Sequence, residues 1–165
     1  MKILGIDPGT VTMGYGVIDS QEDKVALIEC GALVSPARSP IGERLSYLYN
    51  GLLEIISRGQ PDVVAIEQPF MAKNAQSALA IGRAQAVAIL AAASNGIPCY
   101  EYTPTQVKQR VADYGASSKE QIQEMVRLQL GLSQLPQPSD AADALAVALC
   151  HLREIHLESL LSEQR

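Results

Sequence analysis

Residues 3–9 have the sequence ILGIDPG, in which a short apolar run ends at Asp7 and the chain then turns. Residues 63–67 have the sequence VVAIE, a second apolar run that ends at Glu67. Continuous apolar runs of this kind are typical of parallel strands that are covered on both faces. Reacting groups gather at the carboxyl ends of such strands, and neighbouring strands lie about 4.8 Å apart. We therefore predict that Asp7 and Glu67 lie close together, although uncompensated carboxylates beside a core cost several kcal/mol.

Asp140 and Asp143 form a second acidic pair at the start of an alanine-rich segment. Residues three apart on a helix share one face, with side chains about 5–6 Å from each other. Acids are also favoured at a helix N-terminus by the dipole alone, so this pair by itself leaves a structural role open. The same is true of Asp7, which could simply begin a turn before Pro8.

Together these carboxylates would repel a phosphodiester unless cations compensated their charge. Carboxylate oxygens are the ligands that hard cations such as Mg²⁺ prefer. Two such ions about 3.5–4 Å apart can activate water on one side and stabilise the leaving oxygen on the other. We therefore predict a site for two Mg²⁺ ions in which the same acids are metal ligands and catalytic residues: Asp7, Glu67, Asp140 and Asp143.

The order of apolar patterns predicts an α/β fold. Strands are expected at 2–7, 13–19, 24–34, 62–67 and 99–102, and helices at 40–59, 74–95, 104–112, 118–130 and from about 140 onward. This order favours a five-stranded mixed sheet flanked by helices on both faces. We assign residues 1–152 to one domain and residues 153–165 to a C-terminal tail that forms a frayed helix.

The distribution of apolar residues bears on cellular location. The longest uninterrupted apolar stretch, residues 86–93, is far shorter than the roughly 20 residues of a membrane span. The first apolar run is too short for the core of a signal peptide. We therefore expect a cytoplasmic protein with no membrane partner.

The net charge of −5 argues against a nucleic-acid partner, but the charge is unevenly distributed. Residues 70–127 hold six basic and four acidic side chains, whereas both flanking segments are acidic. DNA binding depends on local groups that neutralise phosphates more than on global charge. The basic side chains of this segment are therefore either phosphate contacts or merely solvated: Lys73, Arg83, Lys108, Arg110, Lys119 and Arg127.

Several motifs resemble those of the RuvC-type Holliday-junction resolvases, in family order from residue 2 to about residue 151. They are GIDPG at 5–9, GYG at 14–16, IEQPFMAKN at 66–74, VKQ at 107–109, SKEQ at 118–121 and DAADALA at 140–146. The resemblance implies an RNase H-like fold and a homodimer. It also implies Mg²⁺-dependent cutting of two opposed strands at a four-way DNA junction, in homologous recombination and DNA repair. A hand-off from the RuvA–RuvB branch-migration complex is part of the same expectation.

Residue by residue, the resemblance assigns catalytic roles to the same acids and DNA contacts to four other side chains. Phe70 matches an aromatic residue that stacks on bases near the junction centre, and Lys108 and Lys119 match basic residues that line the DNA cleft. Lys73, in the same motif as Phe70, is assigned to DNA binding with it. From the residues alone, Phe70 could instead be a core side chain. Likewise, the alanine-rich side of the helix at 74–95 could pack on the sheet or on a second copy.

Two other functions remain open at this point. One is an RNase H-like nuclease that acts on RNA, and the other is a non-catalytic junction-binding dimer whose acids bind metal only structurally. A sugar-kinase or actin-like ATPase shares the glycine-rich opening, but 165 residues leave little room for its second lobe.

Overall fold

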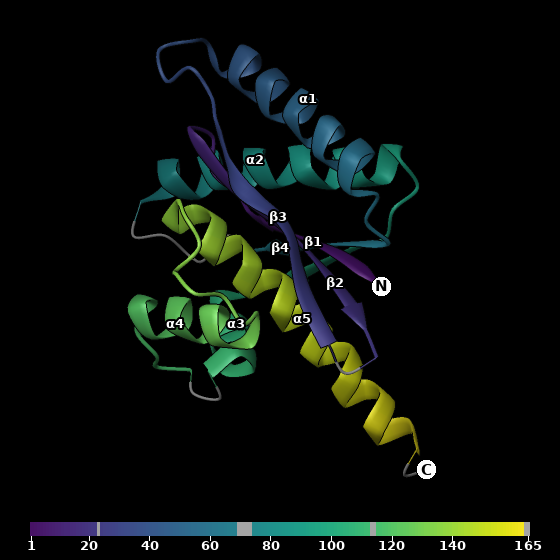
Figure 1. Cartoon of the computed structure of the whole chain (residues 1–165). Helices are drawn as coiled ribbons and strands as arrows, with labels where there is room; N and C mark the ends of the chain where they lie inside the picture. Colours follow the sequence, from purple (N-terminus) through teal and green to yellow (C-terminus); the bar gives the residue numbers. More distant parts are fainter. Residues whose placement is uncertain (23, 69–73, 113–114, 164–165) are drawn as a thin grey trace.

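Five strands form one mixed sheet in the residues that the structure, a computed structural model, describes: 1–22, 24–68, 74–112 and 115–163. The strands are β1 (Lys2–Asp7), β2 (Thr12–Gln21), β3 (Lys24–Val34), β4 (Val63–Glu67) and β5 (Cys99–Tyr102). Their order is β3-β2-β1-β4-β5 (Figure 1). β1, β2 and β3 are joined by antiparallel pairs, and β1, β4 and β5 by parallel pairs. The predicted five-stranded mixed sheet is confirmed.

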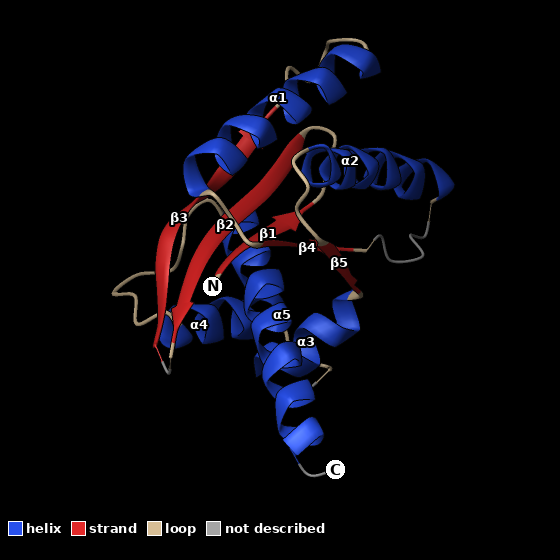
Figure 2. Ribbon diagram, turned by 90° about the vertical axis from the view of Figure 1, so that its right-hand side faces the viewer, coloured by secondary structure: helices blue, strands red, loops and turns tan. Residues whose placement is uncertain are grey.

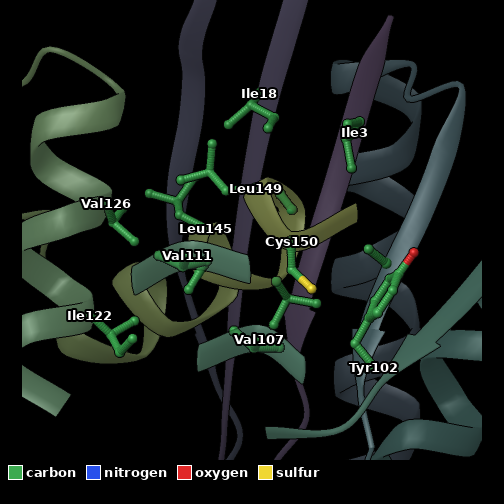
Figure 3. Close-up of a cluster of buried hydrophobic side chains, with 14 of the residues drawn as sticks. Ile3, Ile18, Tyr102, Val107, Val111, Ile122, Val126, Leu145, Leu149 and Cys150 are labelled. Atoms are coloured by element: carbon green, nitrogen blue, oxygen red, sulfur yellow. The ribbon is translucent and has the colours of Figure 1, made fainter. Parts of the chain in front are cut away.

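Helices cover both faces of this sheet, as expected. One face carries α1 (Ile41–Gly59) and α2 (Ala75–Ser94), and the other carries α3 (Pro104–Ala112), α4 (Lys119–Gln129) and α5 (Ser139–Glu163) (Figure 2). Side chains alternate along β1, so Ile3 joins the apolar cluster on the α5 side and Leu4 the cluster on the α1 side. In the first cluster, side chains from α3, α4 and α5 meet those of the sheet (Figure 3): Val107, Val111, Ile122, Val126, Leu145 and Leu149.

Local sequence explains where several helices begin and end. One side of the C-terminal half of α1 is buried, and Gln60 ends the helix in the left-handed conformation, with a φ of 45°. The Asn74 side chain caps α2 by accepting a hydrogen bond from the Gln76 N–H. At the start of α4, Ser118 and Gln121 form a reciprocal capping box.

α2 is covered on one side only. Its buried residues are Ala84, Ala88, Ala91 and Ala92, whereas the Leu90 side chain is 57% exposed. By length and composition alone, the described part of the chain contains one helix apolar enough to cross a membrane, and this helix is α2. The uninterrupted run at 86–93 did not reveal it, because the helix spreads its few polar residues along its length. The buried alanines nevertheless pack this helix into the fold.

α5 lies closer to the sheet than ordinary side chains would allow, because glycines of β1 and β2 face it. A Cβ atom added to Gly5 would lie 2.1 Å from the Ala144 carbonyl oxygen. One added to Gly14 would lie 2.0 Å from the Asp140 carbonyl oxygen. Gly14 in turn pairs with Asp7 across the sheet. This close packing places the first turn of α5 beside the carboxyl end of β1.

α5 continues without interruption across the boundary proposed after residue 152. Glu154 forms an ion pair with Arg110 of α3, so the helix is still packed at that point. Side chains from 157 to 162 are exposed. The division into a domain at 1–152 and a tail at 153–165 stays a prediction.

Replacing Gly14 with alanine should force α5 away from the sheet. We expect Gly14→Ala to lower the free energy of unfolding by about 1–3 kcal/mol, the usual range for overpacked cores. Gly42→Ala is the matched control, because nothing lies within 4 Å of a Cβ atom added there. Urea unfolding followed by circular dichroism measures both variants. Equal stability of the two would contradict the close approach of α5.

Candidate active site

Asp7 and Glu67 end the neighbouring parallel strands β1 and β4, as the sequence predicted. Ile6 pairs with Ile66, so the two acids that follow lie side by side. Both continue the alternation that turns Ile3 toward α5, and both line one cavity on that side of the sheet. The fold therefore brings together two carboxylates that are 60 residues apart in the sequence.

The start of α5 brings the second acidic pair to the same place. Asp143 lines the cavity together with Asp7 and Glu67. Asp140 lies against Gly14, and its charge contributes to the raised pKa of Asp7. Three of the predicted acids thus line the cavity and the fourth stands beside it. The cavity has a volume of about 260 Å³, and its other lining residues are Pro104, Val107, Lys108, Lys119, Ile122 and Ala146.

Burial and like charge make this cavity unfavourable for ionised carboxylates. Burial, followed by the charges of Glu67, Asp143 and Asp140, raises the pKa of Asp7 to about 8. Burial and the charge of Asp143 raise the pKa of Glu67 to about 7. Without added cations, both carboxyl groups therefore stay protonated at pH values well above those at which Asp and Glu ordinarily ionise. The predicted cost of gathering acids beside a core is visible in these values.

Two lysines that line the cavity oppose this repulsion. Lys119 Nζ donates a hydrogen bond of 2.6 Å to Asp143 Oδ2, and its charge lowers the pKa values of Asp7 and Glu67. Lys108 lines the cavity from α3 and lowers the pKa of Glu67 further. The sequence predicted both lysines as DNA contacts. Their position along the acidic cavity suits that role, which stays a prediction.

The donor set fits a hard divalent cation, but the side chains do not surround one as they stand. Within the described residues, no group of three or more His, Cys, Asp or Glu side chains is arranged to hold a metal ion. Asp143 directs one of its oxygens to Lys119 instead. A cation that entered the cavity would take over the compensation that Lys119 now gives. Carboxylate oxygens at this density are suitable ligands for Mg²⁺.

Two predicted DNA contacts, Phe70 and Lys73, lie outside the described residues and stay predictions. Another residue was not singled out from the sequence at all. Arg44 of α1 donates hydrogen bonds to Thr10, in the turn that directly follows Asp7. These partners are 34 positions apart. No local pattern links them, so only the folded chain reveals the contact.

The comparisons with known proteins agree with this geometry. The family model described as crossover junction endodeoxyribonuclease RuvC matches residues 3–151. The chain belongs to the RuvC family. A relative of that name from Dehalococcoides mccartyi is 55% identical over 163 residues, covering 99% of this chain and 98% of the relative. Another, from Chloroflexus aggregans, is 57% identical and covers 92% of each chain.

Solved structures confirm the RNase H-like fold predicted from the resemblance. The Thermus thermophilus RuvC structure is 35% identical, with a TM-score of 0.87, and covers 96% of this chain and 97% of that one. The same protein in complex with Holliday junction substrate gives a TM-score of 0.90 at 36% identity, with 96% of each chain covered. The yeast mitochondrial resolvase Ydc2, at 14% identity and a TM-score of 0.64, shares the fold. The RuvC family resemblance is confirmed, while the roles of individual residues stay predictions.

Without a divalent cation, the protein should lose stability as the pH rises. The pKa of Asp7 is raised from 3.8 to about 8 and that of Glu67 from 4.5 to about 7. Between the ordinary and the raised pKa values, the folded state keeps protons that the unfolded chain has released. The melting temperature in a chelating buffer should therefore fall as the pH rises from about 4 to about 8, and then level off. Asp7→Asn should flatten this fall and melt several degrees higher than the unsubstituted protein at pH 8.

Glu43→Gln provides the control for this experiment, because it removes an exposed carboxylate in the first turn of α1, outside the cavity. Its pH profile should follow that of the unsubstituted protein. If Asp7→Asn also kept the full pH dependence, the carboxylate of Asp7 would not be the repelled and buried group described above.

Proposed function

We infer that the protein is a structure-selective endonuclease that resolves four-way (Holliday) DNA junctions in homologous recombination and DNA repair. The observation that carries this function is the acidic cavity formed where β1, β4 and α5 meet. The chain that builds this cavity matches the RuvC family from residue 3 to residue 151. A related RuvC has been solved with its Holliday junction substrate, on the same fold.

The reaction is phosphodiester hydrolysis, and the acids are its metal ligands. Asp7, Glu67, Asp140 and Asp143 would hold two Mg²⁺ ions, which supply water activation and stabilisation of the leaving oxygen when they are bound. Two ions are favoured over one because four ionised carboxylates carry twice the charge that a single divalent ion compensates. The protein itself supplies a shaped, half-buried cavity and the placement of the carboxylates on a strand pair and a helix.

The two lysines of the cavity supply the attraction for the substrate. Lys108 of α3 and Lys119 of α4 both line the cavity. Ammonium groups there neutralise backbone phosphates and draw the strand toward the acids, which would otherwise repel it. Phe70 and Lys73 follow β4 in the sequence and complete the proposed DNA contacts, with base stacking on Phe70 contributing about 1–3 kcal/mol.

A homodimer would bring two such cavities to one junction. Two symmetric cuts require two sites related by a two-fold axis. α2 offers a surface for the second copy, because Leu79 and Leu90 are 55% and 57% exposed and Ile89 is 36% exposed. Burying this side in a dimer would also account for a helix whose composition is apolar enough for a membrane. We accordingly propose a cytoplasmic dimer that receives junctions from the RuvA–RuvB complex, as the family resemblance implies.

A synthetic immobile four-way junction should receive paired nicks on opposite strands in the presence of Mg²⁺. Asp7→Asn should lower the nicking rate by more than about 100-fold, because it removes a metal ligand. Junction binding should survive in that variant, since the substitution also removes a charge that repels phosphate. Denaturing gels of each labelled strand measure nicking, and mobility shifts measure binding.

The same assay separates the alternative functions. A linear duplex with the same arm sequence controls for structure selectivity, and an RNA–DNA hybrid tests for an RNA-directed nuclease. Binding without nicks at any Mg²⁺ concentration would indicate a non-catalytic junction-binding protein. Single unpaired nicks would argue against the dimer, and undiminished cutting by Asp7→Asn would remove this acid from the catalytic set.

Lys108→Ala should weaken junction binding and lower the slope of log K against log salt by about one unit, because one phosphate contact is lost. Lys24→Ala is the matched control, because Lys24 is an exposed lysine at the start of β3, next to the β2–β3 turn and away from the acidic cavity. Binding titrations at several salt concentrations measure the slope of each variant. A slope for Lys108→Ala equal to that of Lys24→Ala would remove Lys108 from the DNA contacts.

A further inference from the structure

The turn between β1 and β2 begins immediately after Asp7, and side chains from two distant segments hold it. Ser35 Oγ donates to the Thr10 carbonyl oxygen at 2.7 Å and lies 3.3 Å from the Val11 carbonyl oxygen. Arg44 Nε donates to the same Thr10 carbonyl oxygen at 3.1 Å, and Arg44 Nη2 donates to Thr10 Oγ1 at 2.7 Å. Thr10 therefore accepts hydrogen bonds at both its backbone carbonyl and its side-chain hydroxyl.

Within the described part of the chain, Arg44 donates its hydrogen bonds to neutral oxygens of Thr10 and to no carboxylate. Among the ion pairs of the described residues, none includes Arg44, which directs its guanidinium to neutral oxygens instead. The side chain is half-buried, and its partner Thr10 is only 8% exposed. The planar fork of a guanidinium can reach a carbonyl and a hydroxyl of one residue at once, which a lysine ammonium cannot match in geometry.

The backbone of this turn has little conformational freedom, so fixing one residue of the turn also fixes the position of its ends. Proline at position 8 fixes its own φ and removes a backbone donor. A Cβ atom added to Gly9 would lie 2.2 Å from the Thr12 carbonyl oxygen, so the chain is folded tightly back on itself. Asp7 is the last residue of β1. Its backbone is therefore held by the sheet on one side and by this turn on the other.

We propose that Arg44 is a positioning residue for the first acid of the site. By clamping Thr10, it fixes the turn that follows Asp7 and so keeps the Asp7 carboxylate directed at the cavity that it shares with Glu67 and Asp143. Arg44 touches neither substrate nor metal in this role. The inference rests on the proposed function only in one respect, which is the role of the positioned Asp7 carboxylate as a metal ligand.

The test compares Arg44→Met and Thr10→Val with the conservative Thr10→Ser, which keeps the hydroxyl, and with Arg58→Ala as matched control. Arg58 stands on the same helix, and its ion pair with Glu29 ties α1 to β3 (Arg58 Nε to Glu29 Oε2, 3.1 Å). Each protein is studied at a temperature where it is folded. The measurements are Mn²⁺ affinity by calorimetry without DNA, junction binding in a chelating buffer, single-turnover nicking, and hydrogen exchange of the amides at 9–12.

Arg44→Met and Thr10→Val should each weaken Mn²⁺ binding and slow nicking by about 10–100-fold, as losses of supporting contacts around metal ligands do. The double variant should be no worse than Arg44→Met, because that substitution already removes both hydrogen bonds to Thr10, including the one that Thr10→Val removes. Exchange at 9–12 should quicken, while junction affinity and its salt slope stay unchanged. Thr10→Ser should restore all of these, and Arg58→Ala should affect stability alone.

Two results would overturn the proposal. Unchanged exchange and unchanged Mn²⁺ affinity in Arg44→Met would show that Asp7 is held without the clamp. A lower salt slope with weaker junction binding would make Arg44 a phosphate contact instead. Failure of the unsubstituted protein to nick junctions would refute the proposed function, but hydrogen exchange would still decide whether the clamp holds the turn.

Discussion

The site depends on carboxylates that are held close together, partly out of water, against their mutual repulsion. Asp7 and Glu67 cannot move apart, because their strands are paired in register up to the preceding residue. Their raised pKa values express how poorly the cavity tolerates their charges without compensation. Under the proposed function, the same property would give the site its affinity for divalent cations, since each ion that bound would relieve several repulsions at once. Stability and the proposed catalysis would therefore make opposite demands on the same side chains.

Glycines of β1 and β2 allow α5 to complete this arrangement. Sheet-facing side chains normally separate a helix from a sheet, whereas backbone atoms of α5 lie within about 2 Å of where Cβ atoms of Gly5 and Gly14 would be. The apolar contacts of α5 with α3 and α4 hold it there (Figure 3). Asp140 and Asp143 are thus carried by a helix whose following residues, up to 151, are largely buried in the core. A site built this way needs no long loop to bring its ligands together.

The sequence reveals the parts of this site that follow from periodicity. Apolar runs that end in Asp7 and Glu67 identified two strand ends, and the three-residue spacing of Asp140 and Asp143 identified one helix face. Both features depend only on local geometry. Arg44 and Thr10 are 34 residues apart, and Lys119 and Asp143 are 24 residues apart. No pattern of neighbouring residues in the sequence indicates either contact. The full apolar extent of α2 was missed because counting uninterrupted residues ignores how a helix distributes its surface.

Lys119 shows why the substrate and the cation should support each other at this site. Its ammonium is paired with Asp143, yet the lysine side chain is 56% exposed while that of Asp143 is 20% exposed. A phosphate that approaches from solvent therefore reaches the ammonium before it reaches the acids. If Lys119 turned to that phosphate, as the proposed function requires, Asp143 would lose its counter-charge and its attraction for a cation would rise. By reciprocity, a cation bound at Asp143 would free Lys119 for the phosphate, so each ligand would strengthen the binding of the other.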